Sequence, residues 1–152
     1  MMHPRERRQA LERQYPRWEP LTIAGALDRA AATWPDRPFV MTGETTHTYA
    51  GMQAWSRRIA SGLIAAGVKP GQHVALDMAN YPAFVAAKLA IARAGAVTIP
   101  VNFLLRGAEL GYVLQQSDAV HLITMDRFRD HDYLADLDRI APGWRNGATS
   151  AL

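Results

Sequence analysis

The stretch between residues 73 and 124 limits the possible folds of this chain most strongly, because short apolar runs alternate there with helical segments. Residues 73–78, 97–101 and 119–124 are apolar runs of strand length. The intervening segments, 82–94 and 107–117, carry apolar residues at helical spacing. This alternation predicts two right-handed βαβ units and therefore an open, mostly parallel α/β sheet.

Two segments of this stretch also predict how it is buried. The helix 82–94 is apolar on nearly every side, which is typical of a buried helix. The strand 97–101 is apolar without a break, as in parallel sheets that are covered on both faces. We expect Asn80 to cap the helix and Pro82 to lie in its first turn, where a missing N–H is tolerated.

The chain before this stretch predicts a helix and a hairpin. Thr22 can cap a helix that must end before Pro35, because the residue preceding a proline disfavours helical geometry. Residues 39–42 and 47–49 flank a turn and predict two antiparallel strands. The fold class is therefore α/β, with a partial open sheet, flanking helices and a short N-terminal hairpin.

A second helix is expected over residues 50–66, with Thr48 as its N-cap. Gly67 occupies the position at which a left-handed C-terminal cap is favoured. Pro70 and Gly71 then predict a turn, since proline fixes φ and glycine accepts positive φ.

The two ends of the chain differ from its middle. Residues 1–20 predict a basic N-terminal extension, and residues 21–141 form the main domain. Residues 126–140 predict a final charged helix, and an irregular tail follows over residues 142–152.

Composition excludes several classes of function. The sequence contains no cysteine, which excludes disulfides, thiolate metal sites and cysteine nucleophiles, and which agrees with a cytoplasmic location. No apolar run approaches the roughly 20 residues of a membrane span. The net charge is +3, but the arginines are spread along the chain and Arg57–Arg58 is the only tight pair beyond the N-terminus. We therefore expect no nucleic-acid partner.

Several short motifs follow one another in a fixed order. Thr48-Tyr49 opens a helix and is followed by GVKPGQHV from Gly67, then by RAGAVTIPVN, which ends at Asn102. In order and spacing these segments resemble the N-terminal part of the AMP-forming acyl-CoA synthetases, the adenylate-forming ligase family of AMP-binding enzymes. The residues that carry the resemblance, all interpreted as structural, are Thr48, Tyr49, Gly67, Pro70, Gly71, Asn80, Gly95, Pro100, Asn102 and Glu109.

The resemblance implies a reaction with ATP, Mg²⁺ and CoA. Family members convert a fatty or aromatic carboxylic acid to an acyl-adenylate and transfer the acyl group to CoA. In the family, the phosphate loop ending in Pro-Lys and the catalytic lysine lie beyond the region matched here. The sequence contains only two lysines, Lys69 and Lys88, and neither lies in such a loop. We expect no catalytic residue in this chain, no bound cofactor and no activity from it alone.

One candidate binding residue remains, Arg106. In many relatives a basic residue follows the P-x-N strand and approaches the CoA phosphates. Leu104 holds the closest matching position here, and Arg106 is the nearest cation. The alternative is an exposed charge at a helix N-terminus. Five further residues could suggest a metal site, but their spacing is not that of metal ligands, and a charged helix face is the favoured interpretation. These residues are His121, Asp126, Asp130, His131 and Asp132.

Two interpretations of the whole chain stay open. The first is an N-terminal fragment of a ligase, whose partners are the remainder of the synthetase, an acid substrate and CoA. The second is a self-contained α/β binding or interaction module without catalysis. Residues 143–152 lack periodicity and family resemblance, which favours the fragment. A fragment with uncovered apolar surface is also expected to self-associate.

Overall fold

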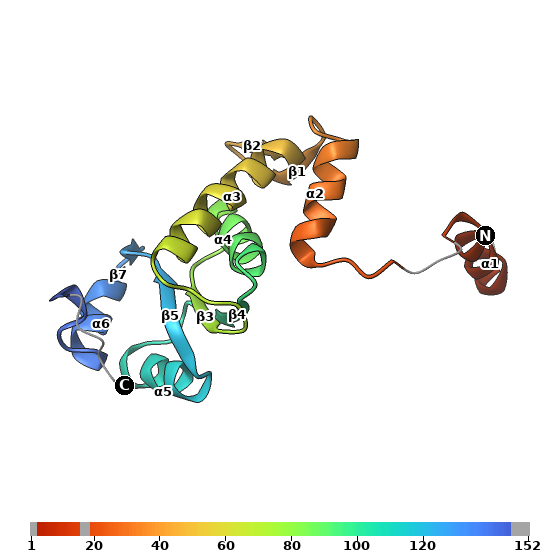
Figure 1. Cartoon of the computed structure of the whole chain (residues 1–152). Coiled ribbons are helices and arrows are strands. Elements are labelled where there is room, and N and C mark those ends of the chain that lie inside the picture. Colours follow the sequence, from red (N-terminus) through yellow and green to blue (C-terminus); the bar gives the residue numbers. More distant parts are fainter. Residues whose placement is uncertain (1–2, 16–18, 147–152) are drawn as a thin grey trace.

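The computed structural model describes residues 3–15 and 19–146, and Figure 1 shows their arrangement. A three-stranded sheet lies at the centre, in the order β4-β3-β5. Its strands are β3 (His73–Asp77), β4 (Val97–Val101) and β5 (Ala119–Thr124). Both neighbours of β3 run parallel to it, so the predicted α/β class and the two βαβ units are confirmed.

Two helices cover opposite faces of this sheet, α4 (Pro82–Arg93) and α5 (Gly107–Gln116). Successive side chains of a strand point to opposite faces. Leu76 accordingly packs in the cluster that contains the apolar residues of α4, whereas Ala75 packs with Leu110 of α5. The central strand is therefore buried on both sides.

A second layer of helices lies over α4 and consists of α2 (Ile23–Thr33) and α3 (Tyr49–Ala65) (Figure 1). Ile91 of α4 packs towards the sheet, while Leu89 packs with Met52 of α3. The helix 82–94 is thus buried between two layers, as its apolar circumference predicted.

The predicted start signals of these helices are confirmed. The Thr22 hydroxyl accepts a hydrogen bond from the Gly25 amide at 3.0 Å at the start of α2. The Thr48 hydroxyl accepts one from the Gly51 amide at 3.1 Å at the start of α3. Each hydroxyl satisfies an amide that has no partner within its helix.

The predicted hairpin is formed by β1 (Pro38–Met41) and β2 (Thr46–Thr48), which pair antiparallel. Phe39 stacks on Tyr49, with ring centres 4.6 Å apart. Val40, on the other face of β1, packs against the cluster of α2, α3 and α4. The hairpin therefore continues the helical layer and is not part of the central sheet.

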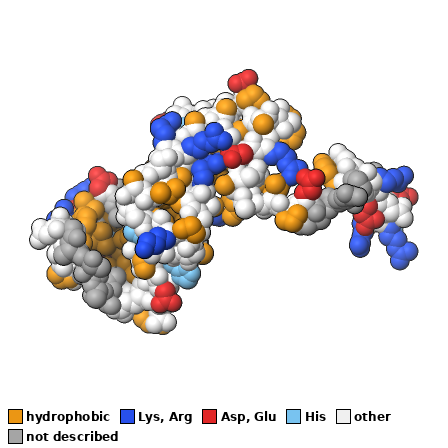
Figure 2. Space-filling model, in the orientation of Figure 1, with side chains coloured by type: hydrophobic (Ala, Val, Ile, Leu, Met, Phe, Trp, Pro, Cys, Tyr) orange, Lys and Arg blue, Asp and Glu red, His pale blue; other side chains and the backbone are white. Residues whose placement is uncertain are grey.

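The described ends of the chain carry two short elements, α1 (Pro4–Gln14) and a 3₁₀ turn, η1 (Trp144–Asn146). None of the residues of α1 is buried, and the helix lies apart from the rest in Figure 1. Figure 2 shows basic side chains interspersed with acidic ones over the visible face. The part of the predicted tail beyond residue 146 lies outside the described residues.

The predicted burial of residues 97–101 is wrong in part. β4 lies at one edge of the three-stranded sheet, and Val97 is 44% exposed. Pro100 is exposed as well, and proline is tolerated on an edge strand because it has no N–H to donate to a neighbouring strand. A continuous apolar run therefore did not distinguish a central strand from an edge strand.

The predicted helix over residues 126–140 is also wrong in its first half. The chain forms a small hairpin of β6 (Arg127–Phe128) and β7 (His131–Asp132), and α6 (Tyr133–Ile140) begins only afterwards. Arg129 turns the hairpin with φ of 55°. The Asp132 carboxylate accepts a hydrogen bond from the Ala135 amide at 2.9 Å. Asp132 therefore acts as an N-cap that sets the later helix start.

Asn80 does not cap α4, contrary to expectation. The N-cap is Tyr81, whose side chain makes no capping hydrogen bond. The Tyr81 amide instead donates to the carbonyl oxygen of Ala79 at 2.7 Å. Pro82 occupies the first helical position, as predicted, where its fixed φ starts the helix.

Candidate functional site

Three of the structural motif residues meet at the amino ends of the strands. The Gly71 amide donates to the Gly95 carbonyl oxygen at 2.8 Å. Gly95 has φ of 76°, and a Cβ there would lie 3.2 Å from Cβ of Pro70. Glycine is required at this position by both conformation and space. Gly67, with φ of 92°, ends α3 nearby in the sequence, as predicted.

Other motif residues lie at the opposite, carboxyl ends of the strands, where open α/β sheets bind their ligands. Asn80 follows β3 and Asn102 follows β4. The Asn102 side chain accepts a hydrogen bond from the Leu104 amide at 3.1 Å and shapes the loop that leads to α5. Glu109 lies exposed in the first turn of α5, where an acidic side chain complements the helix dipole.

Arg106 ends the same loop as the N-cap of α5, so its expected place at a helix N-terminus is confirmed, but it is half-buried and not exposed. Its Nη1 donates to the carbonyl oxygens of Phe103 and Leu105, each at 2.9 Å. The Tyr133 hydroxyl donates to the same Phe103 oxygen at 2.7 Å. The guanidinium carbon of Arg106 lies 5.7 Å from the centre of the Tyr133 ring. Two side chains therefore share one carbonyl oxygen and hold the loop in place.

Asp77 ends the central strand on the face that carries Ala75. It is 1% exposed, and neither carboxyl oxygen has a hydrogen-bond partner among the described residues. Burial raises the pKa of Asp77 to about 6, although the nearby Thr124 hydroxyl and Arg106 lower it in part and Asp136 raises it slightly. Thr124 pairs with Asp77 in register on β5, yet its buried hydroxyl makes no hydrogen bond of normal geometry in the described chain.

Asp136 of α6 is a second buried carboxylate, with 0% exposure. Its Oδ1 accepts a hydrogen bond, whereas its Oδ2 makes none of normal geometry with the described residues. Arg139 donates a hydrogen bond to it, and His131 Nε2 lies 3.0 Å from its Oδ2. Burial alone would raise the pKa of Asp136, but Arg139 and the backbone N–H of Gly107 bring it below its ordinary value. Asp136 therefore ties α6 to the start of α5.

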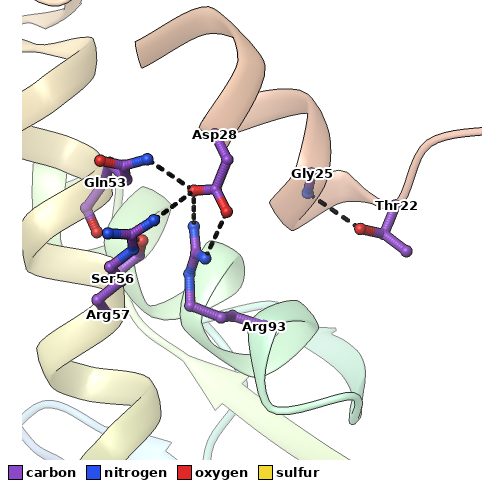
Figure 3. A network of polar contacts seen from close by, with 7 residues as sticks. All are labelled: Thr22, Gly25, Asp28, Gln53, Ser56, Arg57 and Arg93. Atoms are coloured by element: carbon purple, nitrogen blue, oxygen red, sulfur yellow. Dashed lines mark hydrogen bonds and ion pairs between the residues drawn. The ribbon is translucent and has the colours of Figure 1, made fainter. Parts of the chain in front are cut away.

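Figure 3 shows a third carboxylate, Asp28 of α2, within a polar network. Both terminal nitrogens of Arg93 donate to its two oxygens, at 2.9 and 2.7 Å. Gln53 of α3 donates at 2.8 Å, and Arg57 lies 3.6 Å away. The Arg93 guanidinium lowers the pKa of Asp28 to about 2. This network joins α2, α3 and α4 on the side of α4 away from the sheet.

Sequence reasoning did not single out Asp77, Tyr133 or Asp28. Asp77 did carry a signal, because it is the one acidic residue inside the three parallel strands. Tyr133 and Asp28 carried none, since their partners Phe103 and Arg93 lie 30 and 65 positions away in the sequence. Long-range pairs of this kind become visible only in the folded chain.

The described residues do not fit ATP or its metal. Both lysines are exposed, with Lys69 in the turn before β3 and Lys88 on α4, so neither lies at the carboxyl ends of the strands. No group of three or more His, Asp or Glu side chains within residues 3–15 and 19–146 is arranged to hold a metal ion.

Known proteins resemble this chain in both sequence and structure. It is 36% identical to the putative acyl-CoA synthetase YngI of Bacillus subtilis over 123 residues, which is 80% of this chain and 22% of that protein. It is 42% identical to a feruloyl-CoA synthase of Amycolatopsis over 95 residues, 62% of this chain and 19% of that protein. The N-terminal domain of FACL13 from Mycobacterium tuberculosis superposes with a TM-score of 0.66 at 30% identity, covering 69% of this chain and 27% of that one.

The chain thus spans about a fifth of the length of the curated relatives that it matches. The pattern of the family described as AMP-binding enzyme matches residues 27–148, which is most of the chain. This range includes the central sheet, its covering helices and the loop that holds Arg106. From this match and the shared fold we conclude that the chain belongs to the AMP-binding enzyme family.

Proposed function

We propose that this chain supplies the amino-terminal part of the catalytic domain of an AMP-forming acyl-CoA ligase. The complete enzyme would activate a fatty or aromatic carboxylic acid with ATP and Mg²⁺ and transfer the acyl group to CoA. The observation that carries this proposal is the continuous family match over residues 27–148. Relatives named as acyl-CoA and feruloyl-CoA synthases support the substrate class.

Within this function we assign Arg106 the contact with the CoA phosphates. A guanidinium presents five donors, and only its Nη1 is bound to backbone carbonyl oxygens here. The loop that holds it follows the carboxyl end of β4, the edge at which ligands of such sheets bind. Arg106 is thus a held cation with donors left for a phosphate.

The chain alone is expected to form no acyl-adenylate, because neither lysine is placed to bind a phosphate. Purified protein would be incubated with ATP, Mg²⁺ and a panel of fatty and aromatic acids, and pyrophosphate release would be followed. Release above background that copurifies with the chain through stringent purification would contradict this expectation.

A chimera tests the proposed function directly. Residues 21–141 would replace the corresponding segment of a feruloyl-CoA synthase, and feruloyl-CoA formation would be measured. We expect an active chimera, in which Arg106→Ala raises the KM for CoA about tenfold and leaves ferulate-dependent pyrophosphate exchange unchanged. Arg58→Ala, which changes an exposed arginine of α3, is the matched control. A folded chimera without any adenylation would contradict the function, and an unchanged KM for CoA would contradict only the role of Arg106.

Self-association of the isolated chain is a further part of the proposal. Large apolar side chains are exposed on β1, β4 and β5, namely Met41, Val97 and Val120. Sedimentation and binding of a hydrophobic dye would measure this property. A monodisperse monomer that binds no dye would favour the self-contained module. No helix among the described residues is long and apolar enough to cross a membrane, and the cytoplasmic location stays a prediction.

A further inference from the structure

A small cap covers the carboxyl end of the central strand. We define the cap as residues 127–140, which comprise β6, β7 and α6. Its anchor is Tyr133, which is fully buried and packs with Ala79 and Met125, the residues that follow β3 and β5. The Tyr133 hydroxyl also binds the Phe103 carbonyl oxygen at 2.7 Å. One tyrosine therefore holds the cap on all three strand ends.

Asp77 ends β3 close enough to this cap for its charge to interact with Tyr133 and Asp136 of α6. The polar groups that face it are Thr124 from β5, Arg106 from the loop before α5, and Tyr133 and Asp136 from α6. Its neighbour in register on β4, Val101, is apolar. No group in the described chain donates a hydrogen bond of normal geometry to the Asp77 carboxyl oxygens. The Thr124 hydroxyl and Arg106 lower the pKa of Asp77 only in part, so a negative charge buried there is incompletely compensated.

We propose that ionisation of Asp77 loosens the cap from the sheet, and that protonation of Asp77 closes it again. Loosening moves Tyr133 and Asp136 away and admits water to the carboxylate, which removes the cost of burying its charge. The same movement removes the Tyr133 hydroxyl from the Phe103 carbonyl oxygen, which keeps its bond from Arg106, and exposes the loop that contains Arg106. This proposal rests on the packing of the cap alone and does not depend on the ligase function.

The effect of pH on the cap follows from the coupling between proton binding at Asp77 and closure of the cap. Burial raises the pKa of Asp77 from 3.8 to about 6, so the closed cap binds a proton more tightly than the loosened one. The loosened fraction therefore grows as the pH rises through this interval and stays high above it. If the carboxylate is fully solvated in the loosened state, the equilibrium constant for loosening the cap increases about 100-fold in total.

Hydrogen exchange of two cap amides measures this change. The Tyr133 amide donates to the Asp126 carbonyl oxygen at 3.0 Å, and the Ala135 amide donates to Asp132. Both rates would be compared in the wild type and in Asp77→Asn at the same pH, which cancels the intrinsic effect of pH on exchange. We expect the ratio of wild-type to variant rates to rise from several-fold at pH 4.5 to about 100-fold at pH 7.5. The Gly25 amide of α2 is the internal control and should give a constant ratio.

A second variant separates Asp77 from the histidine in the cap. His131 is the histidine of the cap, and its Nε2 lies 3.0 Å from Oδ2 of Asp136. The pH dependence of cap-amide exchange should remain in His131→Asn. If it is lost in His131→Asn but remains in Asp77→Asn, the proposal is overturned. If Asp77→Asn does not fold, the carboxyl ¹³C shift of Asp77 in the wild type decides. A midpoint near 6 that coincides with faster exchange of Tyr133 supports the proposal, and a midpoint near 4 overturns it.

Discussion

The surroundings of Asp28 and Asp77 show two ways in which this chain places a carboxylate. Asp28 is 36% exposed and receives three hydrogen bonds from two helices, so its negative charge is favoured. Asp77 is almost fully buried and receives none of normal geometry from the described residues. The pKa of Asp28 accordingly falls to about 2 through Arg93, while burial raises that of Asp77 to about 6.

Asp136 shows that burial alone does not explain this difference. It is as inaccessible as Asp77, yet donors from Arg139 and Gly107 lower its pKa below the ordinary value despite its burial. The number of hydrogen-bond donors around a carboxylate therefore decides whether its charge stabilises the fold. Asp28 and Asp136 hold helices together, whereas Asp77 opposes the packing of the cap at neutral pH.

Replacing Asp77 should give the largest effect, and it should be stabilising. Because its pKa is raised on folding, the wild type loses stability as the pH rises from 3.8 to about 6. Asp77→Asn removes this loss and should raise the free energy of unfolding by up to about 3 kcal/mol at pH 7.5, but by much less at pH 4.5. Urea denaturation at both pH values measures the change. Asp36→Asn, at an exposed aspartate, is the control, and a destabilised Asp77→Asn at pH 7.5 would refute the account.

Replacing Asp136 should have the opposite sign. Asp136→Asn leaves His131 and Arg139 without their carboxylate and weakens the tie between α6 and α5. We expect a loss of about 2 kcal/mol at pH 7.5, since breaking a buried pair leaves a group uncompensated. The same urea series measures it. Equal signs for Asp136→Asn and Asp77→Asn would remove the distinction between paired and unpaired carboxylates.

Replacing Asp28 should have a smaller effect that does not change between pH 4.5 and 7.5. Its pKa is lowered to about 2, so the stabilisation is complete above 3.8 and is lost only as the pH falls towards 2. Asp28→Asn should lower the free energy of unfolding by about 1 kcal/mol, because the group is partly exposed and solvent screens it. If the loss in free energy of unfolding for Asp28→Asn doubled between pH 4.5 and 7.5, the lowered pKa of Asp28 would be contradicted.

The smallest effect is expected for Arg57 in the same network. Its side chain is 57% exposed and lies 3.6 Å from Asp28, whereas Arg93 is 16% exposed and makes two hydrogen bonds. Arg57→Ala should change the free energy of unfolding by a few tenths of a kcal/mol, and 1 M NaCl should abolish the difference. Arg93→Ala should cost more at either salt concentration. Equal costs for the two arginines would show that hydrogen-bond geometry is unimportant here.

The local features of the fold could be predicted because each depends on neighbouring residues. Thr22 and Thr48 cap helices through amides three positions away, and Gly67 and Gly95 accept positive φ. The parallel direction of the three strands followed from the alternation of apolar runs with helical segments. Asp132 shows the limit, since a cap within a charged segment moved the helix start while the periodicity suggested one continuous helix.

The candidate site could be predicted only in part, because it depends on contacts between distant segments. Arg106 was found through its place after the P-x-N strand, but its burial comes from Tyr133, 27 positions later. The run 97–101 gave no indication that β4 lies at an edge, since edge position is a property of strand order. Asp77 could not be identified from the sequence, because its hydrogen bonding depends on the donors that other elements place around it in the folded chain.

The strand order β4-β3-β5 also has a consequence for synthesis of the chain. The central strand is the first of the three to leave the ribosome, and both of its partners follow it. β3 ends at residue 77 and β5 begins at residue 119, 42 positions later. At about 5–20 residues per second, one hydrogen-bonding edge of the strand has no partner from its own sheet for roughly 2–8 s. The helices α2 and α3 are made earlier and can shelter neighbouring apolar surface, but the edge of β3 must wait for residues 119–124.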